Sequence, residues 1–149
     1  MTAEIRPARA ADASAVTACV TAAYTVYIER MGKPPGPMLD DYADVIADHM
    51  VFVLAVDHDV IGVVVLIAQD GGLLLDNVAV DPDRQGRGFG GRLMDFAEAE
   101  ARRRGYGALD LYTHERMTEN IALYGARGYE ETGRRRVRGY DRVYMRKTL

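Results

Sequence analysis

The sequence predicts an α/β (α+β) fold with a mixed, mostly antiparallel sheet and elements in the order β-α-α-β-β-β-α-β-α-β-β. Apolar, β-branched runs of strand length lie between Gly- and Asp-containing turns. Other stretches repeat apolar residues every three or four positions, which indicates helices. A strand, glycine turn, helix and strand over residues 73–113 form one βαβ unit with a right-handed crossover. The length of 149 residues predicts a single domain, 1–149.

The first part of the chain is expected to form an edge strand and two helices. Pro7 limits pairing of the strand, and Asp12 suits the N-cap of the first helix. Gly32 and the Pro-rich sequence KPPGP end that helix. The expected elements are a strand at Glu4–Arg9, a helix from Asp12 to Met31 and a helix at about Met38–Asp48.

The middle of the chain is expected to form three strands and an amphipathic helix. The tripeptide DHD at residues 57–59 joins two β-branched runs as a hairpin, and Gln69–Gly72 is a second tight turn. The helix has one apolar face and ends at Gly105, with arginines in its last turn complementing the helix dipole. The strands are Val51–Val56, Val60–Ala68 and Leu73–Val80.

The last part is expected to alternate strand and helix and then close with a strand pair. Short apolar runs and Gly-containing turns delimit these elements. They are a strand at Ala108–Thr113, a helix at Thr118–Arg127, and strands at Tyr129–Val137 and Tyr140–Lys147.

Composition excludes several classes of partner. The net charge of −3 argues against a nucleic-acid or anionic-membrane surface. The longest apolar run, Val60–Ala68, is too short to span a bilayer as a helix, and the first residues lack a secretory apolar segment. Cys19 is the only cysteine, which suits a reducing, cytoplasmic setting. No disulfide and no metal are expected.

The glycine turn after Val80 predicts a phosphate site, because glycines bring backbone N–H groups and a helix N-terminus to one spot. Gly86, Gly88 and Gly91 also fit the dinucleotide pattern GxGxxG. We reject that interpretation, because DPDRQ separates the strand from the first glycine and Asp110 lies inside its strand. No Lys-Ser or Lys-Thr follows the glycines, which excludes a Walker loop. The alternative is a tight turn without a ligand.

Two motifs resemble those of the GNAT superfamily of N-acetyltransferases, as in bacterial members of unassigned substrate. VAVDP at residues 78–82 followed by QGRGFG at 85–90 looks like its acetyl-CoA signature, and ALY at 122–124 with Gly128-Tyr129 looks like its second signature. The order of elements agrees over essentially the whole chain. The resemblance implies a GNAT-like sheet with a central, splayed parallel strand pair.

The resemblance also implies where acetyl-CoA, the cosubstrate, would bind. The glycine turn would hold the pyrophosphate through backbone N–H groups, and the strand before it would bond the pantetheine arm like an added strand. Asn77 lies where the family often has a bulge that aims an N–H at the thioester carbonyl. The cofactor-binding residues would be Val78, Ala79, Val80, Gln85, Gly86, Arg87, Gly88, Phe89, Gly90 and Asn120. Met117 stands where many members have asparagine, so Asn120 either contacts the cofactor or caps its helix.

The resemblance makes Tyr124 the general acid that protonates the departing thiolate. The alternative for Tyr124 is a core position. Asp76 is the first candidate for the general base, acting through water, and its side chain could instead face solvent. His114 and Glu115 are rivals, with the imidazole better suited to neutral pH.

The acceptor side is expected to be formed by the first two helices and the Pro-rich loop. Tyr27 and Met31 are the substrate-contact candidates, against the alternative that both are core residues. The run Arg134–Arg138 is a solvated strand face, or meets an acidic acceptor or the CoA 3′-phosphate.

The leading hypothesis is direct acetyl transfer to a primary amine of a small molecule or peptide. The alternatives are a non-catalytic CoA-binding or regulatory module of the same fold, and an enzyme that uses a longer acyl donor. A homodimer is common in the family.

Overall fold

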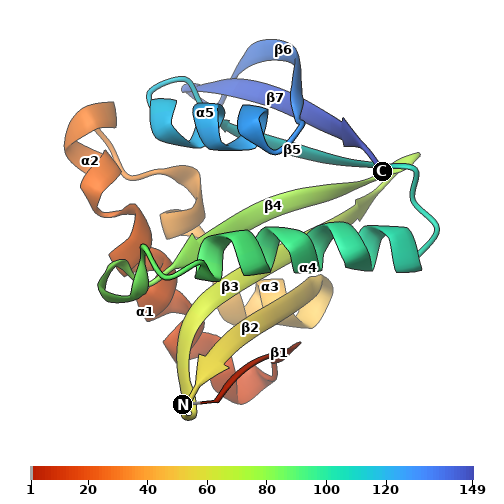
Figure 1. Cartoon of the computed structure of the whole chain (residues 1–149). Helices are drawn as coiled ribbons and strands as arrows, with labels where there is room; N and C mark the ends of the chain where they lie inside the picture. Colours follow the sequence, from red (N-terminus) through yellow and green to blue (C-terminus); the bar gives the residue numbers. More distant parts are fainter. Residues whose placement is uncertain (1) are drawn as a thin grey trace.

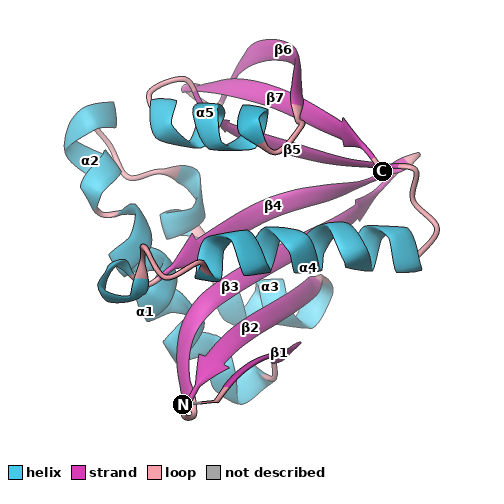
Figure 2. Cartoon of the chain, in the orientation of Figure 1, coloured by secondary structure: helices cyan, strands magenta, loops and turns pink. Residues whose placement is uncertain are grey.

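A computed structural model describes residues 2–149 as one seven-stranded sheet with helices on both faces (Figures 1 and 2). The strand order is β1-β2-β3-β4-β5-β7-β6, with one parallel pair, β4–β5. The strands are β1 (Ala3–Pro7), β2 (Met50–Val56), β3 (Asp59–Gln69), β4 (Gly72–Val80), β5 (Ala108–His114), β6 (Glu130–Val137) and β7 (Tyr140–Thr148). The helices are α1 (Ala13–Tyr24), α2 (Val26–Met31), α3 (Tyr42–Asp48), α4 (Phe89–Arg103) and α5 (Thr118–Ala126). The predicted fold class is confirmed.

The helix predicted as far as Met31 is two helices in the structure. The chain turns more tightly at Thr25, where the N–H of Ile28 bonds the carbonyl of Thr25. The Thr25 hydroxyl bonds the carbonyl of Thr21, a contact that bends helices. Asp12 precedes α1 but does not cap it. Its carboxylate instead accepts from the Arg9 N–H and from both terminal nitrogens of Arg6, at 2.7 to 3.0 Å.

The second predicted helix begins later than expected. Residues Gly36–Leu39 form a short 3₁₀ turn, so the start at Met38 is wrong. The helix α3 begins at Tyr42 because the carboxylate of Asp41 accepts hydrogen bonds from the N–H groups of Ala43 and Asp44.

Two apolar cores lie on opposite faces of the sheet. Helices α1 and α3 cover one face with Val16, Val20 and Tyr42, and α4 covers the other with Leu93 and Met94. In Figure 1, α4 lies in front of the sheet and α1 and α3 lie behind it. Among residues 2–149 no helix combines the length and apolarity needed to cross a bilayer.

The two parallel strands in the middle of the sheet separate along their length. β4 and β5 pair only at Leu74–Asp110 and Leu75–Leu111. Figure 1 shows them close together at one end and splayed at the other. The pairing of β3 with β4 also shifts by one residue, since Val65 faces Asn77 while Leu66 faces Leu75. A bulge therefore lies at Asp76, where the parallel pairing stops.

Candidate active site

The splay leaves one edge of β4 open beyond Leu75. Two side chains meet carbonyl groups there: the Tyr24 hydroxyl lies 3.2 Å from the Val78 oxygen, and the Gln85 amide donates to the Val80 oxygen at 3.2 Å. A groove follows this edge from the glycine turn to α5, and it is lined by Val78, Ala79, Val80, Gly86, Gly90 and Tyr124 among others. The three strand residues and two of the glycines predicted from the sequence therefore line one continuous surface.

The glycine turn presents open backbone toward this groove. Gly86 and Gly88 have φ angles of 80° and 82°, a left-handed conformation that favours glycine, and nothing lies within 4 Å of where a Cβ would stand. Gly88 precedes the first turn of α4, whose N–H groups lack intrahelical partners. Phe89 buries its ring in the core and can offer only its backbone. Arg87 is exposed beside them.

Gln85 differs from the other predicted backbone donors. Its N–H already bonds the Pro82 carbonyl at 3.3 Å, within the turn that follows β4. The residue reaches the groove through its side-chain amide instead. Among residues 2–149 no backbone carbonyl accepts from the N–H groups of Gly86 to Gly90, so the free N–H groups of the turn begin at Gly86.

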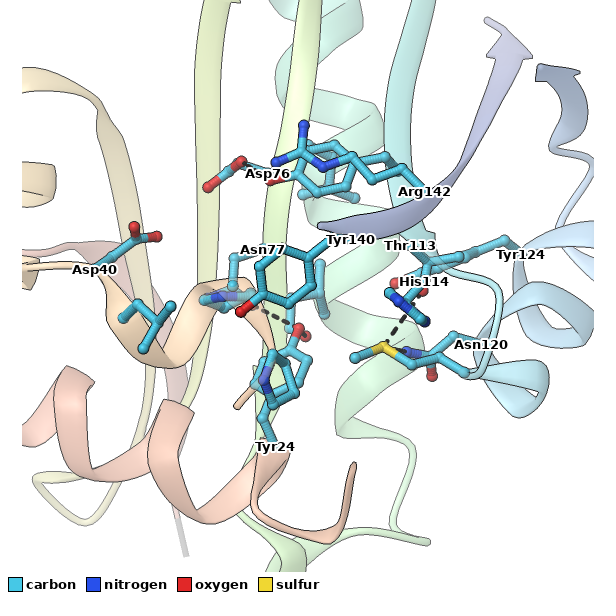
Figure 3. A pocket seen from close by; sticks show the side chains of 18 of the residues that line it. Tyr24, Asp40, Asp76, Asn77, Thr113, His114, Asn120, Tyr124, Tyr140 and Arg142 are labelled. Atoms are coloured by element: carbon cyan, nitrogen blue, oxygen red, sulfur yellow. Dashed lines mark hydrogen bonds between the residues drawn. The ribbon is translucent and has the colours of Figure 1, made fainter. Parts of the chain in front are cut away.

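A second cavity, of about 200 Å³, lies at the splayed end of the sheet, on the far side of Tyr124 from the glycine turn. Its walls come from β4, β5, β7, α5 and the Pro-rich loop at 35–40. Figure 3 shows Asp76, Asn77, His114, Tyr140 and Arg142 arranged around it. The cavity and the groove share Tyr24, Val78, Asn120 and Tyr124. These four residues therefore form the junction between the two hollows.

Tyr124 is half-buried at this junction. Burial raises the pKa of its phenol to about 12, and the nearby Tyr27 adds to the effect. Among residues 2–149 no group accepts a side-chain hydrogen bond from its hydroxyl, although its ring packs edge-on against Tyr129 with centroids 6.0 Å apart. The phenol therefore stays protonated at physiological pH with its proton available.

Asp76 lies at the bulge of β4 and lines the cavity. Burial raises the pKa of its carboxyl, opposed by a 2.9 Å hydrogen bond from the Tyr112 hydroxyl and by the charge of Arg142. Figure 3 shows the carboxylate close to the Arg142 side chain. Asp40, across the cavity, also has a raised pKa because of burial and the nearby Asp76 charge. A raised pKa makes the ionised Asp76 a stronger base.

The two rival bases are placed differently. His114 lines the cavity, but backbone N–H groups point at both of its ring nitrogens, from Arg116 at 3.1 Å and from Asp141 at 3.3 Å. Because neutral imidazole has one acceptor nitrogen, only one of these contacts is a hydrogen bond, and neither nitrogen offers a clear lone pair to a substrate. Burial also lowers the pKa of His114. Glu115 lines neither hollow.

The predicted substrate contacts are not brought together. Tyr27 lines the groove on the glycine-turn side, with the Arg30 guanidinium 5.2 Å from its ring centre. Met31 lines neither hollow and packs against the core under α1 and α3. Asn120 lies at the junction, where its amide makes only a weak 3.6 Å contact with the Met117 sulfur. Met117 itself is buried.

A buried polar chain that sequence reasoning missed fixes the bulge. The Asn77 side chain accepts from the Tyr24 hydroxyl at 2.8 Å and donates to the Tyr42 hydroxyl at 3.0 Å. The Tyr42 hydroxyl donates in turn to the Pro37 carbonyl at 2.7 Å. This chain links α1, β4, α3 and the Pro-rich loop. The sequence signals Tyr24 and Tyr42 only as apolar-face positions.

Tyr112 and Arg142 are further residues that sequence reasoning missed. A signal existed for Tyr112, because Leu109 and Leu111 alternate with Asp110 and Tyr112 along β5. Within residues 2–149 no group of three or more His, Cys, Asp or Glu side chains is arranged as a metal site.

Comparison with known proteins identifies a family match. A family model described as an acetyltransferase (GNAT) domain matches residues 47–131, more than half of the chain. The mouse protein N-alpha-acetyltransferase 80 is 40% identical over 65 residues, which are 44% of this chain and 19% of that protein. The match thus spans about a fifth of the mouse protein's length.

Solved structures share the fold over the whole chain. PaiA N-acetyltransferase from Thermoplasma acidophilum, in complex with coenzyme A, has a TM-score of 0.82 at 18% identity and covers 100% of both chains. A GNAT family acetyltransferase from Elizabethkingia anophelis with acetyl-CoA bound has a TM-score of 0.78 at 19% identity, covering 99% of this chain and 98% of that one. The ribosomal-protein-S18-alanine N-acetyltransferase from Escherichia coli has a TM-score of 0.78 at 21% identity, covering 99% and 94%.

Proposed function

Because the chain belongs to the GNAT family of acetyltransferases, we propose that it transfers the acetyl group of acetyl-CoA directly to a primary amine. The observation that carries this proposal is the junction at Tyr124, where the groove from the glycine turn meets the second cavity. The groove suits the donor and the cavity suits the acceptor. The acceptor is a small-molecule or peptide amine, and the name of the E. coli neighbour, an alanine N-acetyltransferase, supports keeping peptide α-amines in that class.

The donor fits the residues of the groove. Acetyl-CoA supplies the acetyl group as a thioester, and its pyrophosphate needs unshielded N–H groups such as those from Gly86 to Gly90. The empty space at the Cβ positions of Gly86 and Gly88 leaves room for phosphate oxygens. The open edge of β4 from Val78 to Val80 offers main-chain groups to the pantetheine arm.

The chemistry requires one base, one acid and a donor for the carbonyl oxygen. Asp76, directly or through water, takes a proton from the amine as the new C–N bond forms. Tyr124 gives its proton to the sulfur as the C–S bond breaks. We assign the donor for the carbonyl oxygen to a backbone N–H of the bulge at Asp76 and Asn77, where the pairing of β4 with β3 is interrupted.

The acid role predicts the behaviour of Tyr124→Phe. Turnover should fall by about 100-fold or more, the usual contribution of a general acid, while the affinity for CoA stays within a few fold. With a phenol pKa of about 12, the wild-type rate should not fall from tyrosine ionisation below about pH 11. Thiol release from acetyl-CoA with a panel of amines measures the rate.

The control is Tyr106→Phe, which removes a hydroxyl at the far end of α4 with no side-chain hydrogen bond among residues 2–149. Unchanged turnover of Tyr124→Phe at every pH would remove the acid role.

Tight CoA binding without amine-dependent thiol release would favour the non-catalytic binding module. Competition between acetyl-CoA and longer acyl-CoAs tests the donor.

Three broader features also belong to the proposal. The chain forms one acetyltransferase domain, because its seven strands belong to one sheet. A cytoplasmic location rests on the single cysteine, which is buried and unpaired. A homodimer is proposed from the family pattern alone.

A further inference from the structure

The acceptor cavity continues into a second groove on the uncovered face of β5, β7 and β6. Tyr112 and Arg142 line both hollows, so a ligand could extend from one into the other. The groove is also lined by Arg134, Arg135, Tyr144 and Arg146. No residue of β6 lines the groove that leads from the glycine turn. The arginine run of β6 therefore lies on the acceptor side rather than beside the CoA pyrophosphate.

Two of the four arginines in this groove already have carboxylate partners. Arg146 binds Asp110 through two hydrogen bonds, at 2.6 and 3.2 Å. Arg134 binds Glu131 through two hydrogen bonds at 3.1 Å. These pairs neutralise two of the four positive charges in the groove.

The other two arginines, Arg135 and Arg142, have no carboxylate within 4.0 Å among residues 2–149. Each guanidinium lies over a tyrosine ring instead, Arg142 at 4.0 Å from the Tyr112 centre and Arg135 at 4.5 Å from the Tyr144 centre. The two rings are neighbours, with centres 5.9 Å apart. Stacking holds both guanidinium groups in place. One terminal nitrogen of Arg142 also donates to the Tyr144 hydroxyl at 3.4 Å, and the remaining N–H groups are available to an anion.

We propose that the acceptor is an amine whose remainder carries anionic groups, and that Arg142 and Arg135 bind those groups. This inference rests on the proposed function. Asp40 and Asp76 place negative charge at the amine end of the cavity, and the two arginines place positive charge along the way out. The charges orient an acceptor with its ammonium inward and its anionic part outward. A guanidinium held by stacking binds a carboxylate or phosphate through two parallel hydrogen bonds.

The test compares three peptides that share the same N-terminal residue. The next three positions are all Glu in the first peptide, all Gln in the second and all Lys in the third. Small amines with and without a carboxylate form a second arm, which separates a peptide source from a small-molecule source. At saturating acetyl-CoA, kcat/KM for the acidic acceptor should exceed that for the neutral one by about tenfold or more, as expected for one charge-assisted contact. The excess should shrink as salt is added.

The variant Arg135→Gln should reduce the acidic-to-neutral ratio of kcat/KM by about tenfold. The control, Arg136→Gln, makes the same change one residue further along β6, at an exposed side chain that lines neither hollow and pairs with Asp141. It should leave the ratio unchanged. An equal rate for all three peptides, a preference for Gln or Lys, or a ratio unaffected by Arg135→Gln would overturn the proposal while leaving acetyl transfer intact.

Calorimetry with the N-acetylated acidic peptide on the CoA-bound protein tests the groove without turnover. Binding that weakens in Arg135→Gln but not in Arg136→Gln supports the groove, even if no amine in the panel is acetylated. Arg135-dependent binding without acetylation of any amine would reject the proposed function but not the anion-binding role of the groove. No difference in binding between acidic and neutral products would reject the proposal that Arg135 and Arg142 bind the anionic part of the acceptor.

Discussion

At the scale of single residues, Asp76, the proposed general base, carries a charge that costs the folded protein stability. Its side chain is half-buried, and burial raises the pKa of its carboxyl above the ordinary 3.8. The Tyr112 hydrogen bond and the Arg142 charge offset only part of this effect. A folded state with a raised carboxyl pKa holds the proton more tightly than the unfolded chain. Ionisation of Asp76 therefore lowers stability as the pH rises from 3.8 through the folded pKa.

Asp76→Asn should consequently lose activity and gain stability. The amide cannot accept the amine proton, so turnover should fall by about 100-fold or more. Its oxygen can still accept the Tyr112 hydrogen bond, so the melting temperature at pH 7 to 8 should rise. That gain should disappear below about pH 3.8, where the wild-type carboxyl is protonated in both states. Thermal melts across pH, with steady-state rates, measure both effects.

Asp70→Asn is the matched control for that change. Asp70 is exposed in the turn between β3 and β4, away from the cavity. The control should keep both the rate and the pH dependence of the melting temperature. A rate for Asp76→Asn close to that of the wild type would show that another group is the general base. An unchanged melting temperature would show that burying the Asp76 charge costs little stability.

At the scale of elements, the glycine turn between β4 and α4 must adopt a left-handed backbone and must also leave room for a phosphate. Two alanine variants distinguish the first requirement from the second. Gly88 and Gly71 have nearly the same backbone, with φ angles of 82° and 76°, and both have open space at the Cβ position. Alanine at either site should cost about 1 kcal/mol because the left-handed conformation is strained. Gly88 lies between Gly86 and Gly90, which line the groove proposed for the donor, whereas Gly71 lies in the turn between β3 and β4.

Gly88→Ala should therefore raise the Kd for CoA by about tenfold or more, because the added methyl group stands where a phosphate oxygen would approach the backbone. Gly71→Ala should lose similar stability without a change in Kd. Calorimetric titration and thermal melts of both variants give the comparison. Equal CoA affinity in both would mean that the pyrophosphate is held elsewhere.

At the scale of the whole molecule, contacts between distant segments bridge the splayed sheet. The Tyr140 hydroxyl donates to the Pro34 carbonyl at 2.6 Å, and the Lys33 ammonium lies 4.0 Å from the Tyr140 ring centre. On the donor side, Arg30 of α2 binds Glu119 of α5 at 2.7 Å. The exposed ion pair contributes little stability. The Pro-rich loop is held at its other end by Tyr42 and so forms a fixed wall of the cavity beside Asp76.

Tyr140→Phe should loosen this loop without changing the chemistry. The Pro34 carbonyl loses its donor, so amide exchange in residues 36–41 should accelerate and KM for the acceptor should rise a few fold. The Kd for CoA should stay the same, because Tyr140 does not line the donor groove. Exchange mass spectrometry and steady-state kinetics measure these effects, with Tyr106→Phe as control. Unchanged exchange would mean that the loop is held by its other contacts.

Much of the fold follows from local sequence patterns. Where an element differs from the one that its pattern predicts, a local side-chain hydrogen bond is the cause. Alternation along β5 and the three- and four-residue spacing in α4 identify their buried faces. The divided first helix depends on the Thr25 hydroxyl, and the late start of α3 depends on the Asp41 cap. Such side-chain bonds compete with the backbone pattern, so apolar periodicity does not reveal them.

The sequence by itself determined the half of this protein that we propose for the donor, because β4, the glycine turn and α4 are consecutive and their geometry is set by neighbouring residues. Only the tertiary structure decided the half that we propose for the acceptor. Asn77 meets Tyr24 from 53 residues away, and Tyr140 meets Pro34 from 106 residues away. A periodic pattern says which face of an element is buried, but the partner across the cavity depends on how the sheet splays and bulges at Asp76.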